Sequence, residues 1–141
     1  ASWISYLTSD CARHWATGTS APCISIFRPI SLEHPRDVGS AEGHWGSQSL
    51  WWRFESLHRR LMLDWTVADQ LRAQRDQIEQ AIFARPADAD VHWRAADDWL
   101  STWEERIDVV EDRRPNWLRR QWEKVIAEAA GGNRMPPRNE L

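Results

Sequence analysis

The chain has 141 residues, of which 42% are hydrophobic and 28% are charged, and its formal net charge is -3. These values are typical of a single globular domain, so disorder and a collagen-like fold are excluded. No apolar stretch approaches the ~20 residues that span a bilayer, and the 21 acidic residues offset the 18 basic ones, so we expect neither a membrane nor a nucleic-acid partner.

Short β-strands are predicted for residues 1–32. This part is rich in Trp, Ile, Thr, Tyr and Phe and is interrupted by turn-forming residues. We place three strands, at Trp3 to Thr8, Arg13 to Thr17 and Cys23 to Arg28. Ile24 and Ile26 give the third strand apolar character on both faces, so we expect a covered central strand whose pairing ends at Pro29.

A loop is predicted for residues 33–47, which combine glycines, prolines and polar residues without a period. The pattern is helical over residues 48–130, and the tail 131–141 is irregular. The apolar spacing predicts one long amphipathic helix from Leu50 to Ile82, capped by Ser47 or Ser49 and ended by Pro86.

Two further helices are predicted after Pro86. One begins near Asp88 or Asp90 and continues to Val110, and the other runs from Leu118 to Ala129 and ends at two glycines. Strands followed by helices indicate an α+β fold, with short antiparallel strands and about three long helices. The first residue is Ala1 and a strand follows at once, so we expect this chain to be a piece of a longer protein.

Few side-chain patterns point to chemistry. Glu55 and His58 form an ExxH pair, but a di-metal centre needs a second such pair, so we interpret them as a helix-surface pair with Arg59. We expect no metal and no cofactor. The remaining histidines lack the spacing of a metal site and are interpreted as solvated or hydrogen-bonded: His14, His34, His44 and His92.

The tryptophans and cysteines favour structural interpretations. Four of the 11 tryptophans fall on apolar helix faces, so we predict that they belong to the core: Trp65, Trp99, Trp103 and Trp122. Cys11 and Cys23 lack a CxxC spacing, and nothing in the sequence supports a disulfide between them. No export leader is recognised, so a reducing, cytoplasmic setting is expected.

Two segments resemble the C-terminal part of secernin-like dipeptidases, which are cysteine-type N-terminal-nucleophile hydrolases. They are HWATGTSAPCISIFRP, from His14 to Pro29, and LWWRFESLHR, from Leu50 to Arg59. The resemblance implies part of a four-layer αββα sandwich. It also implies cleavage of an amide or peptide bond by a processed N-terminal cysteine, whose own α-amino group activates the thiol.

In the resembled family the nucleophile lies far upstream of these segments, so we assign no catalytic residue here. The candidate substrate-binding residues are Thr17, Thr19 and Ser20, because hydroxyls at a turn between strands can bond a substrate. The competing interpretation is that these hydroxyls bond their own backbone, as turn residues commonly do.

Two functions remain open from the sequence. The chain is either the C-terminal fragment of an amide hydrolase for small peptides or acyl-amides, inactive alone, or a non-catalytic α+β protein-interaction module. Because the strands supply too few neighbours for a complete sheet, the expected partner is the missing N-terminal portion of the same protein or a second copy of this chain.

Overall fold

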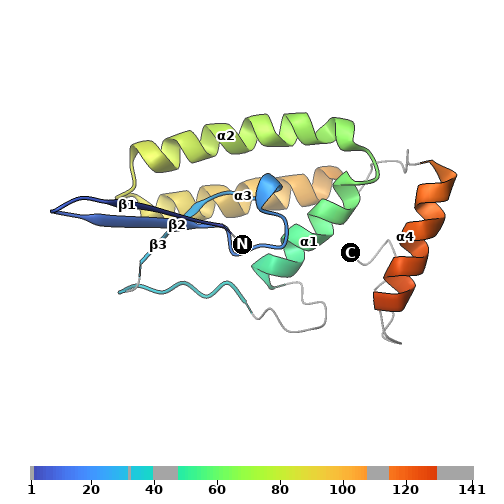
Figure 1. Ribbon diagram of the computed structural model, residues 1–141. Coiled ribbons are helices and arrows are strands. Elements are labelled where there is room, and N and C mark those ends of the chain that lie inside the picture. Colours follow the sequence, from blue (N-terminus) through green and yellow to red (C-terminus); the bar gives the residue numbers. More distant parts are fainter. Residues whose placement is uncertain (1, 32, 40–47, 108–114, 130–141) are drawn as a thin grey trace.

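The computed structural model describes residues 2–31, 33–39, 48–107 and 115–129. A three-stranded antiparallel sheet precedes four α-helices (Figure 1), which confirms the α+β class. The strands are β1 (Trp3–Leu7), β2 (Ala12–Ala16) and β3 (Arg28–Ile30). The helices are α1 (Leu50–Leu61), α2 (Ala68–Ala84), α3 (Ala89–Ile107) and α4 (Asn116–Ala129).

The sheet has the order β1-β2-β3, so β2 is its central strand. Ser5 of β1 pairs with His14 of β2, and Trp15 of β2 pairs with Pro29 of β3. Every residue of β1 is exposed. The sheet therefore presents an uncovered edge strand at one side.

The prediction of a covered central strand at Cys23 to Arg28 is wrong. A 3-10 helix occupies Pro22–Ile24, with the proline in its first turn, where a missing N–H costs least. Strand pairing begins only at Arg28 and includes Pro29, which we expected to end it. Pro29 is tolerated because β3 lies at the sheet edge.

The prediction of one helix from Leu50 to Ile82 is also wrong, because the helix ends at Leu61. Asp64 takes an extended conformation, and its Oδ1 accepts a hydrogen bond from the Thr66 N–H at 3.0 Å. This cap starts a short 3-10 helix that leads into α2, so the chain reverses direction (Figure 1). Trp65 lies in the reversal and is 44% exposed, so its predicted place in the core is wrong.

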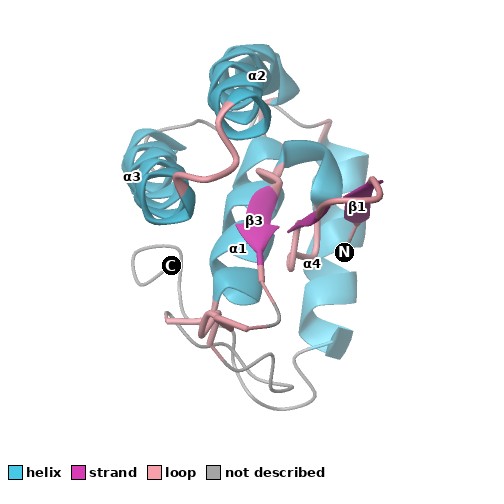
Figure 2. Cartoon of the chain, turned by 90° about the vertical axis from the view of Figure 1, so that its left-hand side faces the viewer, coloured by secondary structure: helices cyan, strands magenta, loops and turns pink. Residues whose placement is uncertain are grey.

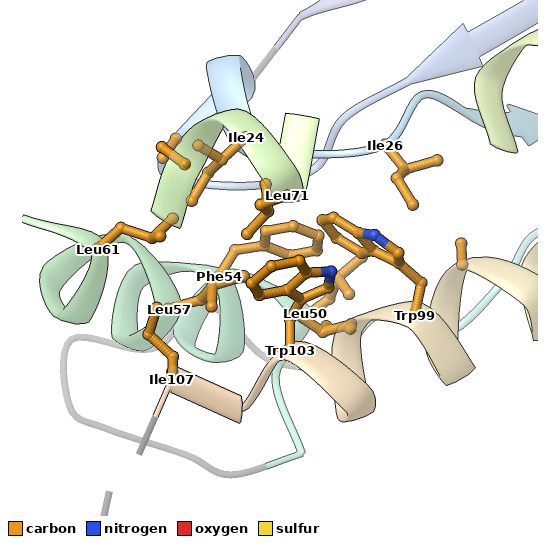
Figure 3. Packing of buried hydrophobic residues seen from close by; sticks show 14 of the residues in the cluster. Ile24, Ile26, Leu50, Phe54, Leu57, Leu61, Leu71, Trp99, Trp103 and Ile107 are labelled. Carbon is orange, nitrogen blue, oxygen red and sulfur yellow. The ribbon is translucent and has the colours of Figure 1, made fainter. Parts of the chain in front are cut away.

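The hydrophobic core lies where α1, α2 and α3 meet the segment between β2 and β3 (Figure 3). Trp99 and Trp103 are buried in it, as predicted. Other large buried side chains come from all four parts: Phe54, Leu57, Leu61, Leu71, Ile82, Leu100, Ile107, Ile24 and Ile26. The two isoleucines are thus in the interior, but they reach it from an irregular segment and not from a strand.

The remaining predictions concern capping and the ends of the helices. Ser49 is the N-cap residue of α1, although its hydroxyl makes no capping hydrogen bond. The side chain of Trp122 and the residues Val110, Gly131 and Gly132 lie outside the described parts.

Figure 2 shows α2 and α3 side by side, with α1 behind β3. Within the described ranges, no helix has the length and apolar character needed to cross a membrane.

Candidate functional site

The turn between β2 and β3 is held together by its own hydroxyl groups. Thr17 and Thr19 are almost completely buried. The Thr17 Oγ1 accepts a hydrogen bond from the Ser2 N–H at 2.9 Å, and the Thr19 hydroxyl is hydrogen-bonded to that of Ser25. Ser25 also donates to a backbone carbonyl of the same turn at 2.9 Å. These bonds fix the path of the turn.

Ser20 and Glu55 connect this turn to α1. The Ser20 Oγ is buried beside the Glu55 carboxylate without reaching hydrogen-bond geometry. His58 Nδ1 lies 3.9 Å from Glu55 Oε2, and Arg59 Nε donates to Glu55 Oε1 at 2.6 Å. The contact with His58, aided by Arg59 and Ser20, lowers the pKa of Glu55 to about 2 although burial acts in the opposite direction. The ionised carboxylate of Glu55 therefore lies beside the turn.

Two side chains of α2 hold the far end of the turn. Arg75 donates to the Cys23 carbonyl, and Glu79 accepts a hydrogen bond from the Phe27 N–H at 2.9 Å. Burial raises the pKa of Glu79, while the Phe27 N–H and the charge of Arg75 oppose that rise. The backbone between Cys23 and Phe27 is therefore anchored by side chains of a helix, and pairing with β2 begins only at Arg28.

Arg28 brings a charge from β3 into the interior. Its side chain is 3% exposed, and its Nη1 donates to Asp97 Oδ1 at 2.6 Å. Burial lowers the pKa of Arg28, and the bond to Asp97 acts against this. The guanidinium carbon also lies 4.8 Å from the centre of the Trp93 ring. The ion pair and the cation–π contact together tie β3 to α3.

A groove of about 970 Å³, here called the Trp93 groove, opens beside Arg28. Its described walls come from β2, from β3 with residues 31 and 33–36 after it, and from the turn between α2 and α3 with the first residues of α3. Trp93 is fixed in the wall because its Nε1 donates to the Pro29 carbonyl at 2.8 Å. Small-molecule sites typically enclose roughly 300–1,000 Å³, so the Trp93 groove has the size of such a site.

Nucleophile and base are not assembled in the described residues. Cys11 and Cys23 are both unpaired thiols. Ser5 Oγ and His14 Nδ1 are 2.9 Å apart, but a serine nucleophile also needs a group that orients the imidazole, and His14 has no such hydrogen bond in the described ranges. The same ranges contain no group of three or more potential metal ligands.

The three residues predicted to bind substrate share this turn but face different groups. Thr17 and Thr19 point inward and are bonded within the N-terminal segment, whereas Ser20 faces α1. The pairing of Glu55 with Arg59 follows the helical spacing expected for them. A substrate contact by the three hydroxyls stays a prediction.

Sequence reasoning missed the buried contact of Arg28 with Asp97 and Trp93. A signal was present, since Arg28 directly follows the apolar residues Ile26 and Phe27. A charge in such a position needs a partner, because an unpaired buried charge is costly. The partner itself lies 69 residues away and has no local signature.

Comparisons of the chain with protein-family models, with curated proteins and with solved structures return no match.

Proposed function

We propose that this chain is the C-terminal part of a cysteine-type amide hydrolase that cleaves small peptides or acyl-amides. The nucleophile and its α-amino base come from the N-terminal part of the same protein, and the chain alone is inactive. One observation carries the proposal: the two segments that resemble secernin-like dipeptidases, 14–29 and 50–59, meet in space where Ser20 lies against Glu55.

The contact between Ser20 and Glu55 suits a wall of a substrate pocket. Glu55 is ionised and held by Arg59, so it gives the turn a rigid support. Precise placement of groups around a scissile bond depends on such supporting contacts. In this proposal Thr17, Thr19 and Ser20 shape the turn beside the substrate, and the buried Ser20 hydroxyl acts through its contact with Glu55.

The exposure of strand β1 supports the proposal that a partner segment is missing from this chain. Four of its five residues are large and hydrophobic, with 39–68% of their surfaces exposed: Trp3, Ile4, Tyr6 and Leu7. An apolar edge strand without charged residues pairs readily with a further strand. In this proposal the N-terminal part of the same protein supplies that strand.

The two unpaired cysteines agree with a cytoplasmic setting, where thiols are kept reduced.

The alternative is a non-catalytic protein-interaction module. It is favoured by the internal bonding of Thr17 and Thr19, which leaves neither hydroxyl directed outward. In that function β1 would bind another protein and the turn would be purely structural.

The intact mass and the activity of the protein purified from its source test the proposal. We expect a species larger than the 16.5 kDa of this chain, with hydrolysis of a dipeptide panel that iodoacetamide abolishes. We expect Ser20→Ala to raise KM in that protein, and Ser9→Ala, an exposed change after β1, to leave KM unaltered. A 16.5 kDa species without activity would favour the interaction module, and turnover by the chain alone that Cys23→Ala removes would refute the missing nucleophile.

A further inference from the structure

We propose that this chain forms a two-fold dimer in which β1 pairs antiparallel with β1 of a second copy. The occupant of the exposed edge is thus another molecule of the same chain, and the pairing is centred on Ser5. The inference concerns the chain without an N-terminal part, so it does not depend on the proposed hydrolase. Where that part is present, its strand takes the same edge.

The hydrogen bonds at both ends of the β1–β2 hairpin show which backbone groups of β1 point away from β2. The Thr17 N–H donates to the Ser2 carbonyl at 3.0 Å, and the Thr8 N–H donates to the Cys11 carbonyl at 2.9 Å. Along an antiparallel pair, residues bonded in this way alternate with residues whose N–H and C=O groups point outward. The even-numbered residues of β1 are therefore bonded to β2. The residues whose groups point outward are Trp3, Ser5 and Leu7.

The outward-pointing residues define a register in which β1 is complementary to itself. When Ser5 faces Ser5 of the second copy, Trp3 faces Leu7, and these pairs exchange backbone hydrogen bonds. Between them Ile4 faces Tyr6, so every large apolar side chain of β1 meets another one. A slip of one residue sets outward-pointing groups against groups already bonded to β2, and a slip of two leaves one end of each strand unpaired.

β1 lacks the features that prevent pairing at the sheet edges of monomeric proteins. Such edges usually contain a charged side chain, especially lysine, a proline or a bulge. The sequence WISYL has no charge and no proline, and its pairing with β2 runs from Trp3 to Leu7 without a bulge. The hairpin also extends beyond the ends of α2 and α3 (Figure 1), so these helices do not cover that part of the edge. Two copies of β1 therefore meet without repulsion between like charges.

The other edge of the sheet is closed, which favours a dimer over a fibre. β3 has three residues, and Pro29 has no N–H to donate. The Pro29 carbonyl accepts a hydrogen bond from Trp93 Nε1 at 2.8 Å, and Arg28 is bonded to Asp97 of α3. Because α3 occupies this edge, β1 of one copy does not continue the sheet at β3 of another. Pairing of β1 with β1 uses the same surface on both copies and closes after two of them.

The area at the β1 edge predicts a weak and reversible dimer. Between 39% and 68% of each of the four large apolar side chains of β1 is exposed. Since a large aromatic side chain presents roughly 150–250 Å², the two copies together bury roughly 800–1,000 Å². Stable complexes bury about 1,200–2,000 Å², and weak complexes bury less. Backbone hydrogen bonds add affinity, as in other cases of strand addition, so we expect dimers to increase over about 10–500 μM chain.

Two measurements on the chain test the pairing. Sedimentation equilibrium distinguishes the 16.5 kDa monomer from a dimer, and hydrogen exchange followed by NMR reports on the backbone amides of β1. We expect a monomer–dimer equilibrium in which the amides of Trp3, Ser5 and Leu7 exchange more slowly as the concentration rises. The amides of Ile4 and Tyr6 are the internal control, because they are bonded to β2 at every concentration.

Two variants test the register. Ser5→Lys places two ammonium groups opposite each other at the two-fold axis, so the dimer dissociation constant should rise at least about tenfold. Gln77→Lys makes the same change of charge at an exposed residue of α2, outside the sheet, and should leave the dissociation constant within about twofold. Because Ser5 and Gln77 are both exposed, circular dichroism should show the same fold in both variants.

Any of four results overturns the proposal. They are a monomer over the whole concentration range, an open-ended oligomer, a dimer in which the amides of Trp3, Ser5 and Leu7 gain no protection, and equal dissociation constants for Ser5→Lys and Gln77→Lys. The exchange measurement needs no variant, so it decides even where Ser5→Lys does not fold. None of these results depends on whether the protein from its source is larger than this chain, which is the test of the proposed hydrolase.

Discussion

Trp103 is the side chain whose removal should destabilise the fold most clearly. It is 2% exposed and packs beside Phe54 and Trp99 where α1 and α3 meet (Figure 3). A buried tryptophan hides about 150–250 Å² of surface. At about 25 cal/mol per Å² this is worth about 4–6 kcal/mol, of which an alanine retains a part. We therefore expect Trp103→Ala to lower the free energy of unfolding by about 3–5 kcal/mol.

A smaller share of this loss belongs to a hydrogen bond. Trp103 Nε1 donates to Gln74 Oε1 at 2.9 Å, and Gln74 is an exposed residue of α2. Because water can replace the amide, Gln74→Ala should cost only about 0.5–1.5 kcal/mol. Most of the effect of Trp103→Ala should therefore come from lost packing.

Urea unfolding followed by circular dichroism at the helical band measures these differences, since fluorescence of 11 tryptophans would mix their signals. Trp117→Ala is the matched control, because Trp117 is 65% exposed and its loss should cost less than about 0.5 kcal/mol. Equal midpoints for Trp103→Ala and the control would refute the assignment of Trp103 to the core.

Three further predictions address Glu55, Arg28 and Gly39. The contacts that lower the pKa of Glu55 to about 2 stabilise the fold above about pH 4.5, and this stabilisation is lost as the pH falls toward 2. Glu55→Gln should therefore weaken the fall of the urea midpoint between pH 4.5 and pH 2. The same fall in the wild type and the variant would contradict the lowered pKa. Asp97→Ala should lower the free energy of unfolding, measured in urea, by about 2–3 kcal/mol, because it leaves the Arg28 charge buried without its partner. The second substitution Arg28→Met, made in the Asp97→Ala variant, should restore part of this free energy. A further decrease would show that Arg28 stabilises the fold without Asp97. Gly39 has a φ of 74°, and a Cβ there would lie 2.7 Å from the Ser49 Cα. Gly39→Ala should therefore lower the free energy of unfolding by more than about 1–2 kcal/mol. Gly18→Ala is the control and should not lower it, because the space around Gly18 is open.

The α+β class could be predicted because hydrophobic periodicity is a local property of the sequence. The same local periodicity does not reveal the end of α1, because the apolar spacing continues through Leu61, Trp65 and Ala68 although the backbone reverses there. The spacing of Asp64 and Thr66 was the available sign of a new helix start. Here the capping residues, and not the apolar period, determine where the chain turns.

The segment from Cys23 to Phe27 could not be predicted from its own residues. It is apolar enough for a strand, but its backbone is bonded by Arg75 and Glu79, which lie 52 residues further along. For the candidate site, the pairing of Glu55 with its helical neighbours follows from spacing. The approach of Ser20 to Glu55 depends on the tertiary fold and has no counterpart in a local pattern.

The contacts that hold residues 23–29 against α2 and α3 also have a consequence for the order of folding. They join residues 52 to 69 positions apart, whereas β1 and β2 are joined by a short turn. Closing a long loop costs more chain entropy than closing a short one, so the hairpin and the helical pair should form before these contacts. Weakening the bond between Arg28 and Asp97 should then speed unfolding while leaving the folding rate nearly constant, which would make this bond a determinant of the lifetime of the folded chain.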